Sequence, residues 1–201
     1  MIVLYDYPDC PYSQKVRVVL AEKDLEFERK LVDLRKGEQR TAEFLKLNPY
    51  GKVPVLVDDD VVVYDSTIIN EYLDEEYPNP PLMPEDSAGR AVTRMLEDLA
   101  DTLFIPRADI VVAELYKPEA ERDNEKLRKY QGEMGRVLAR LESQLDGHEY
   151  LVGDFSIADV AFVPRLMILP QLGVEVDARL QNVAAWIGRL RERPSVRTLL
   201  S

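Results

Sequence analysis

Cys10 is the only cysteine among 201 residues and the residue best suited to nucleophilic chemistry. It follows an apolar run at residues 2–5, which is typical of a buried strand, and it precedes Pro11. Because proline at the first helical position loses no hydrogen bond, Cys10 is expected at or beside a helix N-cap. That end of a helix stabilises an anion, so the spacing predicts a reactive thiolate, which the nearby Asp6 and Asp9 would oppose. The alternative is a cysteine that packs as a small buried hydrophobic residue.

Ser13 stands where a dithiol redox motif would carry its second cysteine. An internal disulfide cycle is therefore excluded, and any redox chemistry must be monothiol, with an outside thiol resolving a mixed disulfide. One cysteine and one histidine also argue against a structural zinc site, and a single cysteine fits a reducing compartment. We expect no metal.

Two further motifs have residues that could hold a small peptide. In residues 51–55, Pro54 begins a predicted strand, which favours a cis peptide bond and leaves the backbone of Val53 open to an added strand. Asp65 and Ser66 precede a predicted helix, where they could bind an ammonium and a carboxylate group or simply cap the helix. With Cys10, these motifs describe a pocket for a peptide that carries an amine, a thiol and carboxylates.

The first 77 residues alternate between strand and helix patterns, in the order βαβα-ββα. This order indicates a mixed four-stranded sheet with helices against it, an α/β unit of thioredoxin type. Strands are expected at 2–5, 27–32, 53–57 and 61–64, and helices at 11–23, within 34–47 and after Asp65.

Four prolines within residues 78–84 cannot continue a helix and predict an extended linker at 78–86. The chain is thus expected to form two domains, 1–77 and 87–201. The second shows only helical patterns and predicts a helical bundle. Its helices are expected at 88–116, 120–145, 156–169 and 179–192, the first with Val92, Met95, Leu96, Leu99, Leu103 and Ile110 facing inward.

Ser156-Ile-Ala-Asp159 has the spacing of a helix capping box. Phe155 and Val160 stand at the two positions of the hydrophobic staple that often accompanies it. We interpret this motif as structural: it fixes the start of a buried helix and contacts no substrate.

The composition narrows the classes of partner. The chain is 46% hydrophobic and 31% charged, as expected of a globular protein, and its net charge is −11. No run of Lys and Arg supplies the basic face that direct nucleic-acid binding requires. No charge-free stretch exceeds nine residues, whereas a bilayer span needs about 20. The N-terminus also lacks the features of a secretion signal. We expect a cytoplasmic protein that binds neither nucleic acid nor membrane.

Taken together, the motifs resemble the cytosolic glutathione S-transferase superfamily along the whole chain. The resemblance implies a thioredoxin-like domain that binds glutathione as co-substrate, an all-helical domain that forms much of the second substrate pocket, and a homodimer. The matching motifs are Cys10-Pro-Tyr-Ser, Asn48-Pro49, Lys52-Val-Pro-Val, Asp65-Ser66 and Phe155-Ser-Ile-Ala-Asp159.

The same resemblance assigns roles to individual residues. Cys10 matches the catalytic position, which is serine in some classes and cysteine in others. Other classes use a tyrosine late in the first strand as the catalytic residue, so Tyr5 and Tyr7 are the alternative candidates for that role. The remaining matches are Val53, whose backbone pairs with the cysteinyl part of glutathione; Pro54, the cis proline; Asp65 and Ser66, which hold the γ-glutamyl group; and Lys52 and Arg40, near the glycine carboxylate. For the pocket of the second substrate, the candidates are Tyr12, Phe104, Arg107 and Tyr116, each with packing or solvent exposure as its alternative.

The resemblance leaves two functions open. One is an enzyme that conjugates glutathione to an electrophile or transfers a thiol to and from a disulfide substrate. The other is a regulator like stringent starvation protein A, which associates with RNA polymerase and which segments such as 17–23 and 80–84 resemble. That group commonly lacks a cysteine at the position of Cys10 and has Pro-His-Pro where this chain has Pro78-Asn79-Pro80. Both departures favour the enzyme.

Overall fold

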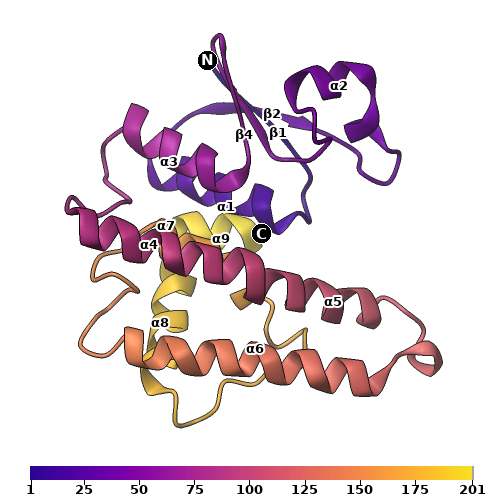
Figure 1. Ribbon diagram of the computed structural model, residues 1–201, viewed down its shortest axis with the longest axis vertical. Helices are drawn as coiled ribbons and strands as arrows, with labels where there is room; N and C mark the ends of the chain where they lie inside the picture. The colour runs from indigo at the N-terminus through magenta and orange to yellow at the C-terminus, as the bar shows by residue number, and fades with distance from the viewer. Residues whose placement is uncertain (201) are drawn as a thin grey trace. The chain divides into compact units, whose positions relative to one another are not determined.

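The computed structural model describes residues 1–200, which divide into two compact units, Met1–Pro81 and Leu82–Leu200. The division falls inside the stretch 78–86 that the prolines mark as a linker. The first unit contains the sheet, and the second is built of helices (Figure 1).

The first unit is a mixed four-stranded sheet in the order β2-β1-β3-β4. β1 pairs in parallel with β2, whereas β3 is antiparallel to both β1 and β4. The central strands are the most apolar because both of their faces are covered, and Leu4, Val55 and Leu56 have no exposed surface. The strands are β1 (Ile2–Asp6), β2 (Phe27–Leu31), β3 (Val55–Asp58) and β4 (Val61–Tyr64).

Helices cover both faces of this sheet. α1 (Pro11–Glu22) and α3 (Ser66–Glu76) lie side by side on one face (Figure 1). On the other face, Phe44 of α2 (Ala42–Leu47) packs into an apolar cluster with Val53 and Val55. The predicted thioredoxin-like architecture is confirmed. The helix expected within 34–47 covers only Ala42–Leu47, because a 3₁₀ turn at Glu38–Arg40 takes the place of its first part.

A buried lysine joins the ends of α1 and α3. The ammonium group of Lys23 donates to the Asp74 carboxylate at 2.8 Å and to the carbonyls of Tyr77 and Pro80 at 2.7 and 2.9 Å. All three donors of the ammonium are therefore used, which offsets the cost of burying its charge. Lys23 thus fixes the point at which the chain leaves the first unit.

The second unit follows the predicted helices with three differences. The helix expected from 120 begins only at Asn124, because a 3₁₀ turn at Glu119–Glu121 comes first. A helix after Pro194 was not predicted, although a proline at a first helical position was its signal. The third difference is a π turn at Ala100–Phe104. The helices are α4 (Ser87–Leu99), α5 (Ile105–Leu115), α6 (Asn124–Gln144), α7 (Ile157–Leu166), α8 (Gln181–Glu192) and α9 (Pro194–Leu200).

The π turn interrupts the long helix predicted at 88–116. Pro106 explains it, because its ring would clash with the carbonyl of Thr102 in a regular helix and its nitrogen cannot donate. The buried stripe ahead of it runs through Thr93, Leu96 and Ala100. Met95 lies off this stripe and is 70% exposed, so the prediction that it faces inward was wrong.

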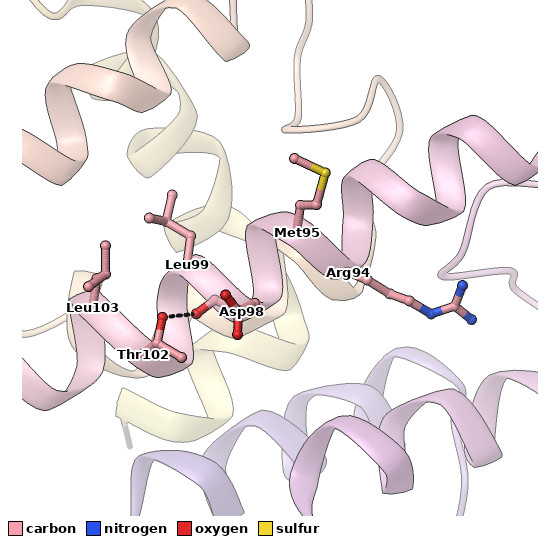
Figure 2. Close-up of a pocket in the computed structure, with 6 residues that line it drawn as sticks. All are labelled: Arg94, Met95, Asp98, Leu99, Thr102 and Leu103. Carbon is pink, nitrogen blue, oxygen red and sulfur yellow. Dashed lines mark hydrogen bonds between the residues drawn. The ribbon is translucent and has the colours of Figure 1, made fainter.

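Met95 lines a groove along α4 and the π turn (Figure 2). Met95, Leu99 and Leu103 project to the same side of the helix, whereas Arg94 points away from them (Figure 2). The Thr102 hydroxyl donates to a backbone carbonyl one turn earlier, at Asp98, over 2.7 Å. Three apolar side chains thus line this groove together with the polar residues Arg94, Asp98 and Thr102.

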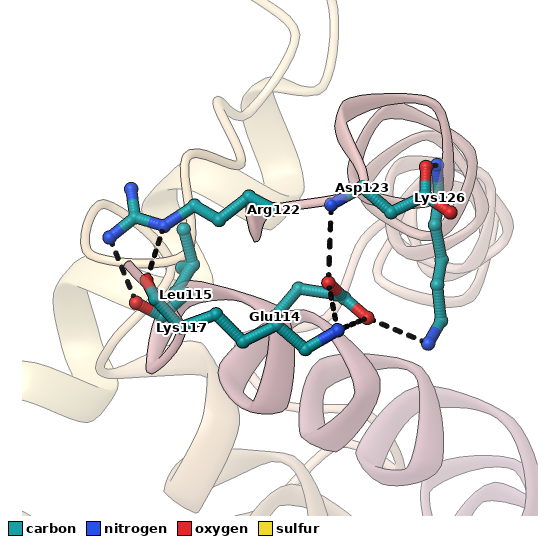
Figure 3. Close-up of polar contacts among 6 residues, drawn as sticks. All are labelled: Glu114, Leu115, Lys117, Arg122, Asp123 and Lys126. Atoms are coloured by element: carbon teal, nitrogen blue, oxygen red, sulfur yellow. Dashed lines mark hydrogen bonds and ion pairs between the residues drawn. The ribbon is translucent and has the colours of Figure 1, made fainter. Parts of the chain in front are cut away.

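A buried carboxylate holds α5 to the start of α6 (Figure 3). Glu114 accepts from the ammonium groups of Lys117 and Lys126, each at 2.8 Å, and from the backbone N–H of Asp123 at 3.3 Å. These bonds, first of all that from Lys117, lower the pKa of Glu114 to about 2. Arg122 donates to two carbonyls at the end of α5, at 3.0 Å each. The cluster secures the turn between the two helices.

The capping box at the start of α7 is confirmed. The Asp159 carboxylate accepts from the backbone N–H groups of Leu151 and Ser156 at 3.0 and 2.9 Å, and from the Trp186 indole at 2.8 Å. Burial of this carboxylate raises the pKa of Asp159 to about 6, despite the hydrogen bonds that lower it. The motif therefore joins α7 to α8 inside the core, in agreement with its structural interpretation.

Within residues 1–200, no helix is both long enough and apolar enough to cross a membrane.

Candidate functional site

The three motifs singled out by their chemistry meet at one edge of the first unit's sheet. Tyr5 of β1 pairs with Val55 of β3, which pairs with Tyr64 of β4. The end of β1, the start of β3 and the end of β4 are therefore neighbours. Each leads directly to one motif: the loop to Cys10, the Val53–Pro54 bond, and Asp65.

Cys10 occupies the N-cap of α1, as predicted, with Pro11 next to it at the first helical position. Its backbone N–H donates to the Tyr7 carbonyl at 3.1 Å, and its carbonyl accepts from the Gln14 N–H at 3.0 Å. The side chain is half-buried, and Sγ lies 4.0 Å from the Val53 carbonyl oxygen. The sulfur thus belongs to the N-cap residue of α1, makes no capping hydrogen bond to the helix, and faces the backbone that was expected to bind a peptide.

The Val53–Pro54 peptide bond is cis, as expected. The loop before it is held by Asn48, which is buried. Its side-chain amide donates to the Lys52 carbonyl at 2.7 Å and accepts from the Tyr50 N–H at 3.0 Å. Asn48 is thus a positioning residue for this loop, a role that the sequence motif alone did not reveal.

Arg40 and Lys52 are exposed cations on neighbouring turns. Gly51, which precedes Lys52 and has φ +61°, packs closely against the turn that carries Arg40. A Cβ at Gly51 would come within 2.9 Å of the Gln39 carbonyl oxygen and 3.5 Å of Arg40 Cδ. Only glycine fits this close approach, which lays Arg40 alongside the loop of Lys52.

Asp65 caps α3, and Ser66 is buried at its first position. The Asp65 carboxylate accepts from the Thr67 N–H at 3.0 Å through Oδ1. The backbone of Asp65 has φ +75°, a conformation that costs a residue with a side chain about 1–3 kcal/mol. Asp65 therefore has the capping role that the sequence analysis gave as the alternative. Its carboxylate is exposed, and its backbone is strained.

The two acids expected to oppose a thiolate are each faced by arginine. Asp6 is fully buried, with Arg29 Nε 2.8 Å from Oδ1 and Arg17 Nε 3.4 Å from Oδ2. The exposed Asp9 has an Arg35 guanidinium nitrogen at 4.0 Å. These pairings join separate elements and carry no local signature in the sequence. They reduce the opposition that Asp6 and Asp9 offer to a negative charge at Cys10.

Tyr5 and Tyr7 are both half-buried and pack against the apolar cluster around Val53. The Tyr5 ring makes an edge contact with Phe44, with centroids 6.3 Å apart, and Lys30 Nζ lies 5.4 Å from its centre. The helix N-terminus is taken by Cys10 rather than by either tyrosine.

The four candidates for a second-substrate pocket do not share one environment. Phe104 is fully buried, 5.4 Å from the Phe162 ring, so it belongs to the helical core and not to a pocket wall. Arg107 pairs with Glu133 at 2.6 Å, joining α5 to α6. Tyr116 is 80% exposed at the end of α5, about 18 Å along the helix from Phe104. Tyr12 is half-buried on α1 of the other unit.

Comparison with known proteins covers both units. The family model described as "Glutathione S-transferase, N-terminal domain" matches residues 9–76, and "Glutathione S-transferase, C-terminal domain" matches 104–194. The chain is 38% identical to glutathione S-transferase 1 of Dianthus caryophyllus over 82% of its own length and 75% of that protein. It is 33% identical to the stringent starvation protein A homolog of Coxiella burnetii, over 100% of this chain and 92% of that one.

Solved structures agree with this likeness. A glutathione transferase of Phanerochaete chrysosporium, crystallised with oxidised glutathione, matches with a TM-score of 0.85 and 27% identity, over 99% of this chain and 93% of that one. The likeness thus extends through both units.

Proposed function

The chain belongs to the glutathione S-transferase family, and we propose that it is a glutathione-dependent enzyme whose nucleophile is the Cys10 thiolate. The observation that carries this proposal is the position of the sulfur, at the N-cap of α1 and 4.0 Å from the Val53 carbonyl oxygen. A helix N-terminus stabilises a thiolate, and the backbone beside it can hold a thiol-bearing peptide against it.

The remaining residues of this sheet edge suit the rest of glutathione. The Val53 backbone would pair with the cysteinyl unit as a short added strand. The exposed carboxylate of Asp65, whose backbone is strained, would accept from the γ-glutamyl ammonium of glutathione. Ser66 and the N-terminus of α3 would bind the γ-glutamyl carboxylate. The cations of Lys52 and Arg40 would pair with the glycine carboxylate.

Cys10 favours thiol transfer between glutathione and a disulfide substrate. Its thiolate attacks the glutathionyl sulfur of a mixed disulfide, forms a Cys10–glutathione disulfide and releases the substrate thiolate, which takes up a proton. A glutathione thiolate then attacks the glutathionyl sulfur of that disulfide, forms glutathione disulfide and regenerates the Cys10 thiolate. Ser13 cannot resolve the intermediate internally, so the second glutathione is required. The same site would also stabilise a glutathione thiolate for conjugation to an electrophile.

Three matched variants test this proposal. Cys10→Ala should abolish thiol transfer, and Cys10→Ser should abolish it while keeping a hydroxyl that supports conjugation. Tyr7→Phe removes only a hydroxyl and should leave both activities near those of the native enzyme. Thiol transfer that survives in Cys10→Ala, or is lost in Tyr7→Phe, would refute the assignment.

The Coxiella burnetii protein matches the whole length of this chain. This match favours a second candidate function, a regulator that binds RNA polymerase. This function needs no working thiol, and the net charge of −11 suits a basic protein partner. A glutathione-affinity column with turnover assays separates the two. Retention with turnover supports the enzyme; failure of both, with polymerase recovered in a pull-down, supports the regulator.

We further propose that the protein is a homodimer and that it works in the cytoplasm. The groove on α4 offers a face for self-association, since Met95 is 70% exposed and Leu99 and Leu103 lie on the same side. Sedimentation should give a dimer for the native protein and a monomer for Met95→Glu. A monomeric native protein would refute this part.

A further inference from the structure

Arg17 reaches from the second turn of α1 back to the loop that carries Cys10. Its Nη2 donates to the Pro8 carbonyl at 2.8 Å, while its Nε lies 3.4 Å from the buried Asp6 carboxylate at the end of β1. Gln14 Nε2 donates to the same Pro8 carbonyl at 3.0 Å. The contact to Pro8 is a hydrogen bond, whereas Nε and Asp6 Oδ2 attract each other as an ion pair without a hydrogen bond between them.

The loop held in this way is short. Only Tyr7, Pro8 and Asp9 separate β1 from Cys10, and the Cys10 N–H closes the turn onto the Tyr7 carbonyl at 3.1 Å. A carbonyl fixed by two donors from α1 leaves this turn little freedom. The position of the sulfur relative to the helix N-terminus therefore depends on the hold on Pro8.

The charge of Arg17 also acts on the sulfur. Burial and Arg29 lower the pKa of Arg17, whereas Asp6, a Cys10 anion and Asp9 raise it. Coulombic attraction is mutual, so Arg17 favours the thiolate of Cys10 as much as that thiolate favours the guanidinium. Because one Asp6 carboxylate faces both Arg17 and Arg29, these three groups carry a net charge of +1, while Asp9 in the loop is faced by Arg35.

We propose that Arg17 is a positioning residue for the Cys10 thiolate, fixing the loop through the Pro8 carbonyl and supplying positive charge to the sulfur. This inference rests on the proposed function, because it assigns Arg17 a part in making Cys10 reactive.

Alkylation of the full chain by iodoacetamide tests the inference without glutathione. The thiolate displaces iodide and forms a thioether, and only Cys10 can report because the chain has no other cysteine. Arg17→Gln should raise the pH midpoint of the alkylation rate by about one unit and slow the reaction at neutral pH about fivefold. Asp6→Asn, which removes the buried negative charge, should shift the midpoint in the opposite direction. Arg179→Gln, at an exposed arginine of the second unit that pairs with Asp177, should leave it unchanged.

The two opposite shifts separate this role from a purely structural one, since loosening of the fold would move both variants the same way. If Asp6→Asn fails to fold, the midpoint of Arg17→Gln still tests the inference, because an unchanged value overturns it. Midpoints unchanged in Arg17→Gln, or shifted in the same direction in both variants, would overturn the inference. Glutathione turnover with unchanged midpoints would refute only the role of Arg17, whereas shifted midpoints without any turnover would refute only the proposed function.

Discussion

Replacing Asp159 by Asn should change stability in a way that depends on pH. The Asp159 carboxylate is fully buried, and its pKa in the folded protein is about 6 against an ordinary value of 3.8. Between these values the folded state binds more protons than the unfolded state, so this group makes the protein less stable as the pH rises towards 6. Linkage gives a loss of about 1.4 kcal/mol between pH 5 and pH 7.5.

The substitution Asp159→Asn removes this titration and costs one hydrogen bond. An amide oxygen at the position of Oδ1 can still accept from the Leu151 N–H and the Trp186 indole. At the position of Oδ2, however, the amide NH₂ would face the Ser156 N–H, which would lose its acceptor at a cost of about 1–3 kcal/mol. The variant should therefore be clearly destabilised at pH 5 and much closer to the native protein at pH 7.5.

Urea unfolding of both proteins at pH 5, 6 and 7.5 measures this difference directly, because all other titrating groups are shared. The free-energy gap between them should shrink by about 1.4 kcal/mol over that range. A gap that stays constant, or that widens with pH, would show that burial does not dominate the titration of Asp159.

Three further substitutions test other parts of the structure. Lys23→Met should lower the free energy of unfolding by about 3 kcal/mol, because it leaves the Asp74 carboxylate buried without its ammonium; urea unfolding would measure this, and an unchanged midpoint would contradict it. Glu114→Gln should lower the melting temperature equally at pH 6 and pH 8. The pKa of Glu114 lies near 2, so its contribution is fully present above its ordinary 4.5 and is lost only as the pH falls towards 2; a loss that differs between pH 6 and 8 would refute this. Gly51→Ala should weaken glutathione binding in calorimetry more than it lowers the melting temperature, since its Cβ would push against the Gln39 carbonyl and shift the loop of Lys52; unchanged affinity would refute the close packing.

The sequence predicted those parts of the structure that have a local cause. Pro11 locates the start of α1 and so the N-cap position of Cys10, and Pro54 indicates the cis bond. The capping box at Ser156 likewise depends on residues three apart. The alternation of elements also indicated a mixed four-stranded sheet, whereas the strand order that brings the site residues together comes from the structure.

Other features depend on contacts between distant segments. The pairing of Asp6 with Arg17 and Arg29 joins a strand, a helix and another strand, and no spacing rule reveals it. Phe104 was a pocket candidate from the family likeness, with core packing as its alternative, and its full burial 5.4 Å from the Phe162 ring favours the alternative. Met95 was assigned to the wrong face because hydrophobic periodicity cannot locate the edge of a buried stripe.

The central claim is that the native fold makes Cys10 reactive towards glutathione. Incubation with glutathione disulfide at neutral pH, followed by intact-protein mass spectrometry, tests it most directly. The native protein should gain one glutathionyl group, faster than the same chain unfolded in urea, and Cys10→Ser should gain none. A native protein that reacts more slowly than the unfolded chain would contradict the claim.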